Sequence, residues 1–249
     1  MLKAIQLLLT SRFKAGLSRI RAIGYNFFND AYAAKSYSQE GEDIVLQRMF
    51  AGKECGFYVD VGAHHPRRFS NTYLFYKRGW QGINIEPNPE AMRAFQSNRK
   101  RDQNLQFGIS DHAETLTYYY FDEPALNSFD AELIRYRLAN TPYKVVRTSS
   151  IPVVRLDHVL AEYLPVGVKI DFLSIDVEGL DFAVLKSNNW KLFRPKCVLV
   201  ESLKSSLEEV LRSDIYLFMK KQGYELFAKT YNTLIFREQE GTIPDGEYK

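Results

Sequence analysis

Acidic side chains stand within or at the end of several short apolar runs of this sequence. These runs are Phe57–Gly62 with Asp60, Gly82–Glu86 with Glu86, Asp171–Asp176 with Asp176, and Lys196–Glu201 with Glu201. A carboxylate in such a place can accept hydrogen bonds from a ribose, take a proton as a general base or hold a hard cation. Each of these chemistries requires that the runs meet at one place.

The surrounding elements predict how the runs meet. The four runs and Leu105–Ser110 are mostly apolar, which predicts buried parallel strands. Helical patterns alternate with them at Glu42–Phe50, Thr72–Arg78, Pro89–Arg99, Asp157–Tyr163 and Leu180–Ser187. Leu207–Lys221 predicts a further helix, and Tyr224–Lys229 with Thr233–Arg237 predict a terminal hairpin. We therefore expect an α/β fold with a doubly wound, mostly parallel sheet, an antiparallel edge and a site at the carboxyl ends of the strands.

The first strand and its turn favour a ligand that carries adenosine without a pyrophosphate. When Gly62 is aligned with the middle glycine of the dinucleotide fingerprint, Asp60 and His65 replace the other two glycines. Those glycines let the backbone approach a pyrophosphate, and a carboxylate at Asp60 would repel that anion, so NAD and FAD are disfavoured. Glu86 ends the next strand, where an acid can bind a ribose diol. The alternative is that Asp60 and Glu86 cap helices or pair with Arg67 or Arg68.

From about Tyr37 to Ser202 the chain resembles the FkbM family of S-adenosylmethionine-dependent methyltransferases. The resemblance rests on five blocks in order, which are SQEGED at 38–43, VDVGA at 59–63, SNT at 70–72, GWQG at 79–82 followed by IEPN at 85–88, and IDVEG at 175–179. It implies a class I, Rossmann-like methyltransferase fold with a seven-stranded sheet. It also implies O-methylation, often of a sugar hydroxyl in a polysaccharide, a glycolipid or a glycosylated natural product.

Geometry and the resemblance together suggest which residues hold S-adenosylmethionine. Asp60 and Gly62 would line its methionine and ribose portion, and Glu86 would bind the ribose hydroxyls. Ser110 and Asp111, at the end of the third predicted strand, are expected at the adenine edge. The neutral amides Gln39 and Asn71 are candidates for the amino-acid end of the cofactor, although either could cap a helix instead.

The catalytic candidates lie after the fourth and first predicted strands. Asp176 is the first choice for the base that takes the proton of a sugar hydroxyl, because burial and neighbouring carboxylates would raise its basicity. Glu178, Glu201 and His64 are further candidates, and His64 and the adjacent His65 cannot both point one way if the backbone is extended.

Two alternatives stay open at these carboxylates. Asp176 and Glu201 could hold a divalent cation such as magnesium, which would polarise the hydroxyl. Glu178 with Gly179 could merely organise the turn into the next helix. No Cys or His cluster has the spacing of a zinc site.

An insertion at about residues 115–155 interrupts the alternation of strands and helices. It contains strand patterns at Thr117–Phe121 and Ile151–Arg155, a polar link at Asp122–Ser128 and a helical pattern at Ala131–Ala139. Its aromatic and basic residues are Tyr118, Tyr119, Tyr120, Phe121, Phe129, Tyr136 and Tyr143 with Arg135, Arg137 and Arg147. Aromatic faces pack on sugar rings and arginines bind anions, so the insertion is expected on the acceptor side; the alternative is an edge strand with ordinary core and surface positions.

Composition limits the remaining choices. The 249 residues include only Cys55 and Cys197, which favours a reducing, cytoplasmic compartment. The net charge of +3 arises from 33 basic and 30 acidic residues and does not indicate nucleic acid as a partner.

The positive charge is concentrated at the N-terminus. Residues 1–36 carry six bases and one acid around an apolar helical stripe, and we expect residues 37–249 to form the methyltransferase domain. The helix of residues 1–27 is predicted to lie at the inner membrane face or, alternatively, to pack on the domain or at an interface of a homo-oligomer. No apolar run is long enough to span a bilayer.

Two other classes of protein compete with the methyltransferase. One is a nucleotide-dependent sugar-modifying oxidoreductase, which should bind NAD(P). The other is a non-catalytic, membrane-associated adapter that keeps the fold and turns over no cofactor.

Overall fold

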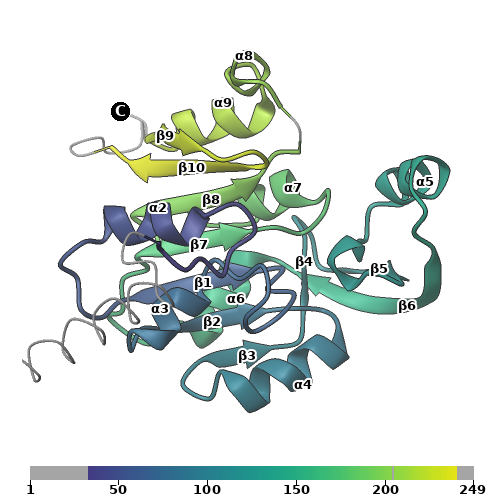
Figure 1. Cartoon of the computed structure of the whole chain (residues 1–249), viewed down its shortest axis with the longest axis horizontal. Helices are drawn as coiled ribbons and strands as arrows, with labels where there is room; N and C mark the ends of the chain where they lie inside the picture. Colours follow the sequence, from purple (N-terminus) through teal and green to yellow (C-terminus); the bar gives the residue numbers. More distant parts are fainter. Residues whose placement is uncertain (1–32, 204, 240–249) are drawn as a thin grey trace, which may run out of the picture. The chain divides into compact units, whose positions relative to one another are not determined.

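The computed structural model describes residues 33–203 and 205–239, which form a mixed α/β structure around a seven-stranded sheet (Figure 1). Across the sheet the strands are β3 (Gln103–Leu105), β2 (Gln81–Ile85), β1 (Phe57–Val61), β7 (Phe172–Ile175), β8 (Cys197–Glu201), β10 (Thr233–Glu238) and β9 (Tyr224–Lys229). The first five run parallel, whereas β10 is antiparallel to both β8 and β9. The predicted mostly parallel sheet of seven strands is confirmed, and β9 and β10 form a hairpin at its edge.

Two apolar layers cover the faces of this sheet. Alternate residues of β1 show the division, since Val59 and Val61 pack into one core and Tyr58 into the other. The first core is completed by α6 (Leu156–Tyr163), α7 (Asp181–Lys186), α8 (Leu207–Val210) and α9 (Asp214–Lys221). The second core is completed by α2 (Glu42–Met49) and α3 (Tyr73–Lys77). Helix α4 (Pro89–Asn98) buries Met92 and Phe95 beside Ala63, just after β1. The carboxyl ends of the parallel strands are thus left for a site.

The insertion builds a second sheet beyond those carboxyl ends (Figure 1). The strands of this sheet are β4 (Gly108–Ile109), which precedes the insertion, and β5 (Glu114–Phe121) and β6 (Val145–Val154) of the insertion itself. The 3₁₀ helix η1 (Pro124–Leu126) and α5 (Ala131–Asn140) lie between β5 and β6 in the chain. The long strands β5 and β6 pair antiparallel, and β4 joins β6 in parallel. Both long strands exceed the predicted ones, because their polar outer residues gave no apolar signal.

The prediction of one strand over Leu105–Ser110 is wrong. β3 ends at Leu105, whose carbonyl accepts the Glu86 N–H at 3.1 Å, and the chain then leaves the main sheet. Gly108 and Ile109 pair instead with β6, where a Cβ on Gly108 would come within 2.8 Å of the Phe129 ring. The same run of apolar residues therefore serves two sheets.

The prediction of one helix over Leu207–Lys221 is also wrong. The first helix, α8, ends at Val210. Ser213 begins the second helix, because its hydroxyl accepts the Tyr216 N–H at 3.2 Å, and the same hydroxyl donates to Val210 O at 2.7 Å. The predicted N-terminal helix of residues 1–27 lies outside the described residues. Within the described ranges, no helix is both long and apolar enough to cross a bilayer.

Candidate functional site

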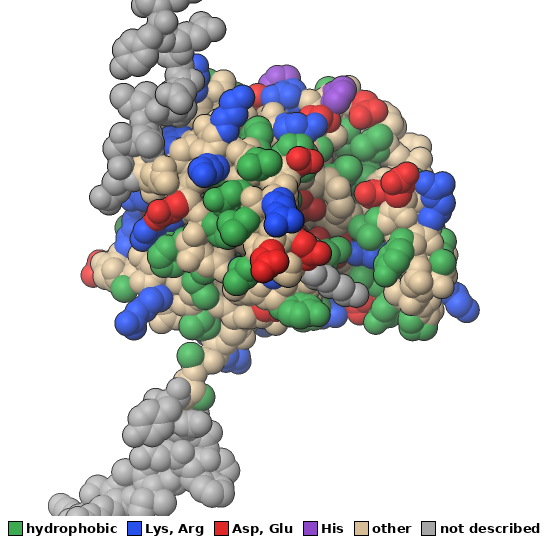
Figure 2. Space-filling view, turned by 90° about the horizontal axis from the view of Figure 1, so that it is seen from above, with side chains coloured by type: hydrophobic (Ala, Val, Ile, Leu, Met, Phe, Trp, Pro, Cys, Tyr) green, Lys and Arg blue, Asp and Glu red, His purple; other side chains and the backbone are tan. Residues whose placement is uncertain are grey.

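A cavity lies at the carboxyl ends of β1, β2 and β7 and is closed on one side by the insertion. Polar residues from the strand ends line it together with an apolar wall at Phe107 and Ile109. Figure 2 shows a hollow in this part of the molecule with acidic side chains at its margin.

Gly62 lies in the turn after β1, where that turn meets the ends of β2 and β7. It has a φ of +79°, and a Cβ there would lie only 1.7 Å from Asp176 O. Its N–H also donates to Ile85 O at 3.0 Å. Only glycine lets the turn after β1 press against both neighbouring strand ends at once.

Asp60 lines the cavity and is buried, with 5% of its surface exposed. Its Oδ2 accepts the Thr72 hydroxyl at 2.9 Å. Burial raises the pKa of Asp60 to about 6, and the Thr72 hydrogen bond and the Arg99 cation oppose that rise.

Glu86 follows β2 and is equally buried. Its two carboxylate oxygens accept separate backbone N–H groups, from His64 at 2.9 Å and from Asn88 at 2.8 Å. Burial raises the pKa of Glu86 to about 7 against the effect of these hydrogen bonds. The alternative pairing with arginines is not what the structure shows, since Arg67 bonds Asn98 and Arg68 bonds Glu123.

The two adjacent histidines have different surroundings. His65 Nδ1 accepts the Arg67 and Arg68 N–H groups at 3.1 and 2.9 Å, so it shapes the turn. His64 lines the cavity with a φ of 52°, and its buried Nε2 has no hydrogen-bond partner within the described part of the chain. Burial, and then the Arg68 cation, lower the pKa of His64 to about 4, so its ring is neutral near pH 7.

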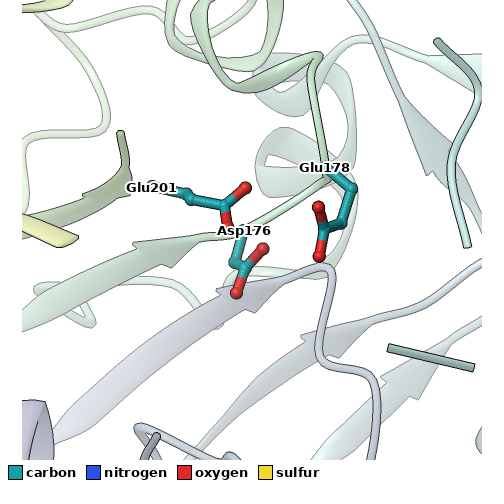
Figure 3. Close-up of side chains that lie close together, drawn as sticks. All are labelled: Asp176, Glu178 and Glu201. Carbon is teal, nitrogen blue, oxygen red and sulfur yellow. The ribbon is translucent and has the colours of Figure 1, made fainter. Parts of the chain in front are cut away.

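Three carboxylates meet at the ends of β7 and β8. One oxygen from each of Asp176, Glu178 and Glu201 lies within 4.8 Å of the other two, and the side chains turn toward a common space (Figure 3). Asp176 is open to the cavity, yet the surrounding protein desolvates it, and this raises its pKa well above the usual range, helped by the charges of Glu178 and Asp181. Desolvation and the neighbouring acids raise the pKa of Glu201 in the same way. Such a cluster holds a proton or a cation more readily than isolated acids do.

Glu178 is the member of the cluster that touches the insertion. Its carboxylate pairs with Arg137 of α5, and its carbonyl accepts the Ser128 hydroxyl at 2.6 Å. The turn itself is organised by Asp181, whose carboxylate accepts the Val177 and Gly179 N–H groups, each at 3.1 Å. The predicted turn-forming role of Glu178 is therefore shared with a residue that the sequence analysis missed.

The structure brings together most of the predicted cofactor residues and leaves two out. Gln39 and Asn71 line the cavity, and Asn71 Nδ2 donates to Ser174 Oγ at 3.0 Å. Ser110 and Asp111 do not line it. Ser110 is bound to β6 through Val154 O, and Asp111 forms an ion pair with Lys186, because the chain has already entered the second sheet. Phe107, Gly108 and Ile109, which directly precede Ser110 and Asp111 in the chain, line the cavity instead.

The aromatic residues of the insertion divide into two groups. Tyr118 and Phe129 line the cavity, with ring centroids 4.6 Å apart. Tyr120 is buried beneath the Arg147 guanidinium, whereas Tyr136 is 60% exposed on α5. Part of the predicted sugar surface is thus ordinary strand packing.

Sequence reasoning missed Phe107 and Ile109, which line the cavity, and the residues that contact its polar groups, Thr72, Ser174 and Asp181, together with Arg99, which contacts Thr72. Thr72 stands in the conspicuous SNT block at 70–72, which was a usable signal. A buried arginine after a helix, such as Arg99, carries no local signal of its role.

Comparison with known proteins adds independent findings. A family model described as the methyltransferase FkbM domain matches residues 60–226, about two thirds of the chain. The methyltransferase sdnD of Sordaria araneosa is 28% identical over 200 residues, which cover 68% of this chain and 74% of that protein.

Proposed function

The chain belongs to the FkbM methyltransferase family, and on that premise we propose that it transfers a methyl group from S-adenosylmethionine to a hydroxyl of a sugar-containing acceptor. The family match confirms the resemblance inferred from the five sequence blocks, and methyltransferases of this kind generally use this donor. The acceptor class is a sugar in a polysaccharide, a glycolipid or a glycosylated natural product. The class I form of the Rossmann-like fold is part of the same proposal, and the strand order β3-β2-β1-β7-β8-β10-β9 supports it.

The observation that carries the proposal is the buried Glu86 beside the Gly62 turn. Glu86 is held by two backbone N–H groups at the end of the second strand and has acceptor capacity left for a ribose diol. The turn has no space for a Cβ at Gly62 and no glycine at positions 60 and 65 for a pyrophosphate. The residues present therefore fit an adenosine ligand without phosphates.

The chain supplies partners for the other parts of this cofactor. Phe107 and Ile109 form the apolar wall suited to adenine. Asp60 with Asn71 and Gln39 supplies acceptors and donors for the amino-acid and ribose portion. When bound, S-adenosylmethionine supplies an electrophilic methyl group.

Asp176 is the residue we assign as the general base. Burial raises its pKa, and a carboxylate of raised pKa is a stronger base toward the proton of the acceptor hydroxyl. Burial, with the charges of Glu178 and Asp181, sustains this basicity. His64 is a weaker choice, because its lowered pKa leaves little affinity for a proton.

A divalent cation such as magnesium is a second way to use the same carboxylates. Asp176, Glu178 and Glu201 offer an oxygen-rich set that suits such an ion, which would polarise the acceptor hydroxyl. Activity that is lost on dialysis against a chelator and restored by magnesium would select this version. Activity that is unchanged by the chelator would select the carboxylate base.

The sugar acceptor is supported by Tyr118 and Phe129 at the insertion side of the cavity, since aromatic faces pack on sugar rings. Arg137 is committed to Glu178, so the predicted recognition of an anionic sugar by this residue loses support. Screening glycan and glycoside acceptors for methyl transfer tests the acceptor class.

The test of the cofactor is calorimetric titration with S-adenosylmethionine, S-adenosylhomocysteine and NAD in parallel. Saturable binding of the first two without NAD is the expected result. Binding of NAD alone would favour the oxidoreductase, and silence from all three would favour the adapter.

Membrane contact through residues 1–27 is a separate proposal, carried by the basic amphipathic pattern of that segment. Flotation with anionic vesicles should recover the full chain and lose the variant that lacks residues 1–30. Equal recovery of both proteins would end the membrane proposal and favour a helix that packs on protein.

A further inference from the structure

A buried polar network lies beneath Asp60 and centres on Arg99, none of whose surface is exposed. The Arg99 Nε donates to Asp102 Oδ2 at 2.9 Å, and Nη1 donates to Pro66 O at 3.1 Å. Nη2 donates to Thr72 Oγ1. A fully buried guanidinium needs such partners, and one of its donors is aimed at the residue that contacts Asp60.

The hydrogen bonds of Thr72 have a defined direction. Arg99 can only donate, so Thr72 Oγ1 must accept from it. The Thr72 hydroxyl has a single proton, which it donates to Asp60 Oδ2 at 2.9 Å. In the 3.2 Å contact between the Thr72 and Ser70 hydroxyls, Ser70 is therefore the donor, and its oxygen accepts the Tyr73 N–H at 3.1 Å.

The charges around Asp60 show why this direction matters. Burial raises the pKa of Asp60, and the negative charge of Asp102 adds to that effect. Asp60 also interacts with Glu86 across the β1–β2 edge and with Asp176 after β7, both of which are acids. The Thr72 hydrogen bond and the Arg99 cation act in the opposite sense and favour the carboxylate form.

We propose that Arg99 and Thr72 are positioning residues that act through Asp60, fixing it as an ionised and oriented acceptor for the amino-acid and ribose portion of S-adenosylmethionine. The inference rests on the proposed function. Asp60 contacts the ligand, whereas Thr72 and Arg99 favour its ionised form and fix the orientation of its side chain. Protonated Asp60 would present a donor in place of an acceptor, so ligand affinity follows its ionisation.

The test measures the affinity of S-adenosylhomocysteine by calorimetry from pH 5.5 to 8.5. The wild type should lose affinity as the pH falls through about 6, the pKa of Asp60. Thr72→Val keeps the shape of the side chain and removes the hydroxyl, so the pH of half-maximal affinity should rise by about one unit. Thr72→Ser restores the hydroxyl and should return the profile to that of the wild type.

Two further variants guard the interpretation. Thr230→Val is the matched control, because Thr230 Oγ1 donates to the buried Glu42 at 2.8 Å outside the cavity lining, and its profile should not move. Thr72→Ala removes the same hydroxyl and leaves space for water, so it replaces Thr72→Val if that protein does not fold.

The outcomes separate this inference from the function on which it rests. Wild-type protein that binds no S-adenosylhomocysteine at any pH overturns the proposed function and, with it, the positioning role of Arg99 and Thr72. Wild-type binding combined with unshifted profiles in the Thr72→Val and Thr72→Ala proteins overturns the positioning role alone. In that case a lowered melting temperature would show that the network only supports the fold.

Discussion

The two sides of the cavity treat their carboxylates in different ways. On the proposed cofactor side, Asp60 accepts a hydrogen bond from a hydroxyl and Glu86 accepts two from backbone N–H groups. On the acceptor side, Asp176, Glu178 and Glu201 crowd within 4.8 Å, and within the described residues Glu178 is the member that pairs with a cation, Arg137.

The contrast separates binding from chemistry. Directed hydrogen bonds hold Asp60 and Glu86 in fixed geometry, which reduces what ligand binding must order. Crowded acids store repulsion that a proton or a cation relieves, so they are suited to take a proton from an acceptor. We therefore expect the first side to bind the cofactor and the second side to react with the acceptor.

The largest effect is expected from Asp176→Asn, which removes the proposed base and keeps its shape. We expect kcat to fall about 10²- to 10⁴-fold, because a positioned base contributes that much. Affinity for S-adenosylhomocysteine should change little, since Asp60 and Glu86 remain. Initial rates and calorimetry on the same preparation measure both quantities.

The matched control for that change is Asp157→Asn. Asp157 pairs with Arg155 away from the cavity lining, so its loss should leave kcat unchanged. If Asp176→Asn also retains the wild-type kcat, the division between binding and chemistry is wrong.

Gly62→Ala should break the junction between the two sides. The new Cβ would lie 1.7 Å from Asp176 O at a φ of +79°, so the backbone must shift. We expect about 3 kcal/mol lower free energy of unfolding, measured by denaturant titration. Gly52→Ala is the control, because Gly52 has a similar φ of +83° and no atom within 4 Å of an added Cβ. Equal losses in the two proteins would mean that backbone strain, and not the contact with Asp176, limits this position.

Glu86→Gln tests the cofactor side alone. The amide replaces one acceptor by a donor that faces the N–H of His64 or Asn88, and it weakens the bond to a ribose diol. Affinity for S-adenosylhomocysteine should fall about 10- to 100-fold while kcat at saturation changes less. Glu90→Gln, an exposed change in the first turn of α4, should leave affinity unaltered. A fall in kcat without a fall in affinity would move Glu86 to the reacting side.

The sequence was informative where periodicity and strand ends coincide. Asp60, Glu86 and Asp176 each lie at a recognisable strand end, so their convergence could be predicted from the parallel pattern. The insertion could be recognised by its broken rhythm. Both signals are local, and the long-range contacts of the folded chain agree with them.

The sequence was uninformative where one run serves two structures. Nothing local shows that the chain leaves the main sheet after Leu105, so Ser110 and Asp111 were placed at the end of a main-sheet strand, whereas they follow β4 of the second sheet. The role of Arg99 depends on contacts with Pro66 and Thr72, which are distant in sequence. Long-range hydrogen bonds of this kind have no periodic signature.

The smallest predicted effect is the dependence of stability on pH that buried acids around the cavity cause. Burial raises the pKa of Glu86 and of Asp181 to about 7, so each binds a proton in the native state that the unfolded state has already released. Stability should therefore fall as pH rises from 6.5 to 8.5, by about 1 kcal/mol for each group.

Groups whose pKa values are lowered in the folded protein do not reverse this fall in stability between pH 6.5 and 8.5. His64, with a pKa lowered to about 4, acts in the opposite sense, but only below about pH 6.5, the usual value for histidine. Asp111 and Glu123, whose pKa values are lowered by Lys186 and Arg68, titrate below the window. Asp176, Glu178 and Glu201, whose pKa values are also raised by burial, act in the same sense as Glu86 and Asp181. Thermal unfolding of the ligand-free protein across pH 6.5 to 8.5 should show the decline, and Glu86→Gln should remove only its own share, about 1 kcal/mol. A wild-type protein that becomes more stable as pH rises through this window would contradict the raised pKa values of these buried acids, of which Glu86 is the one held by the His64 and Asn88 hydrogen bonds.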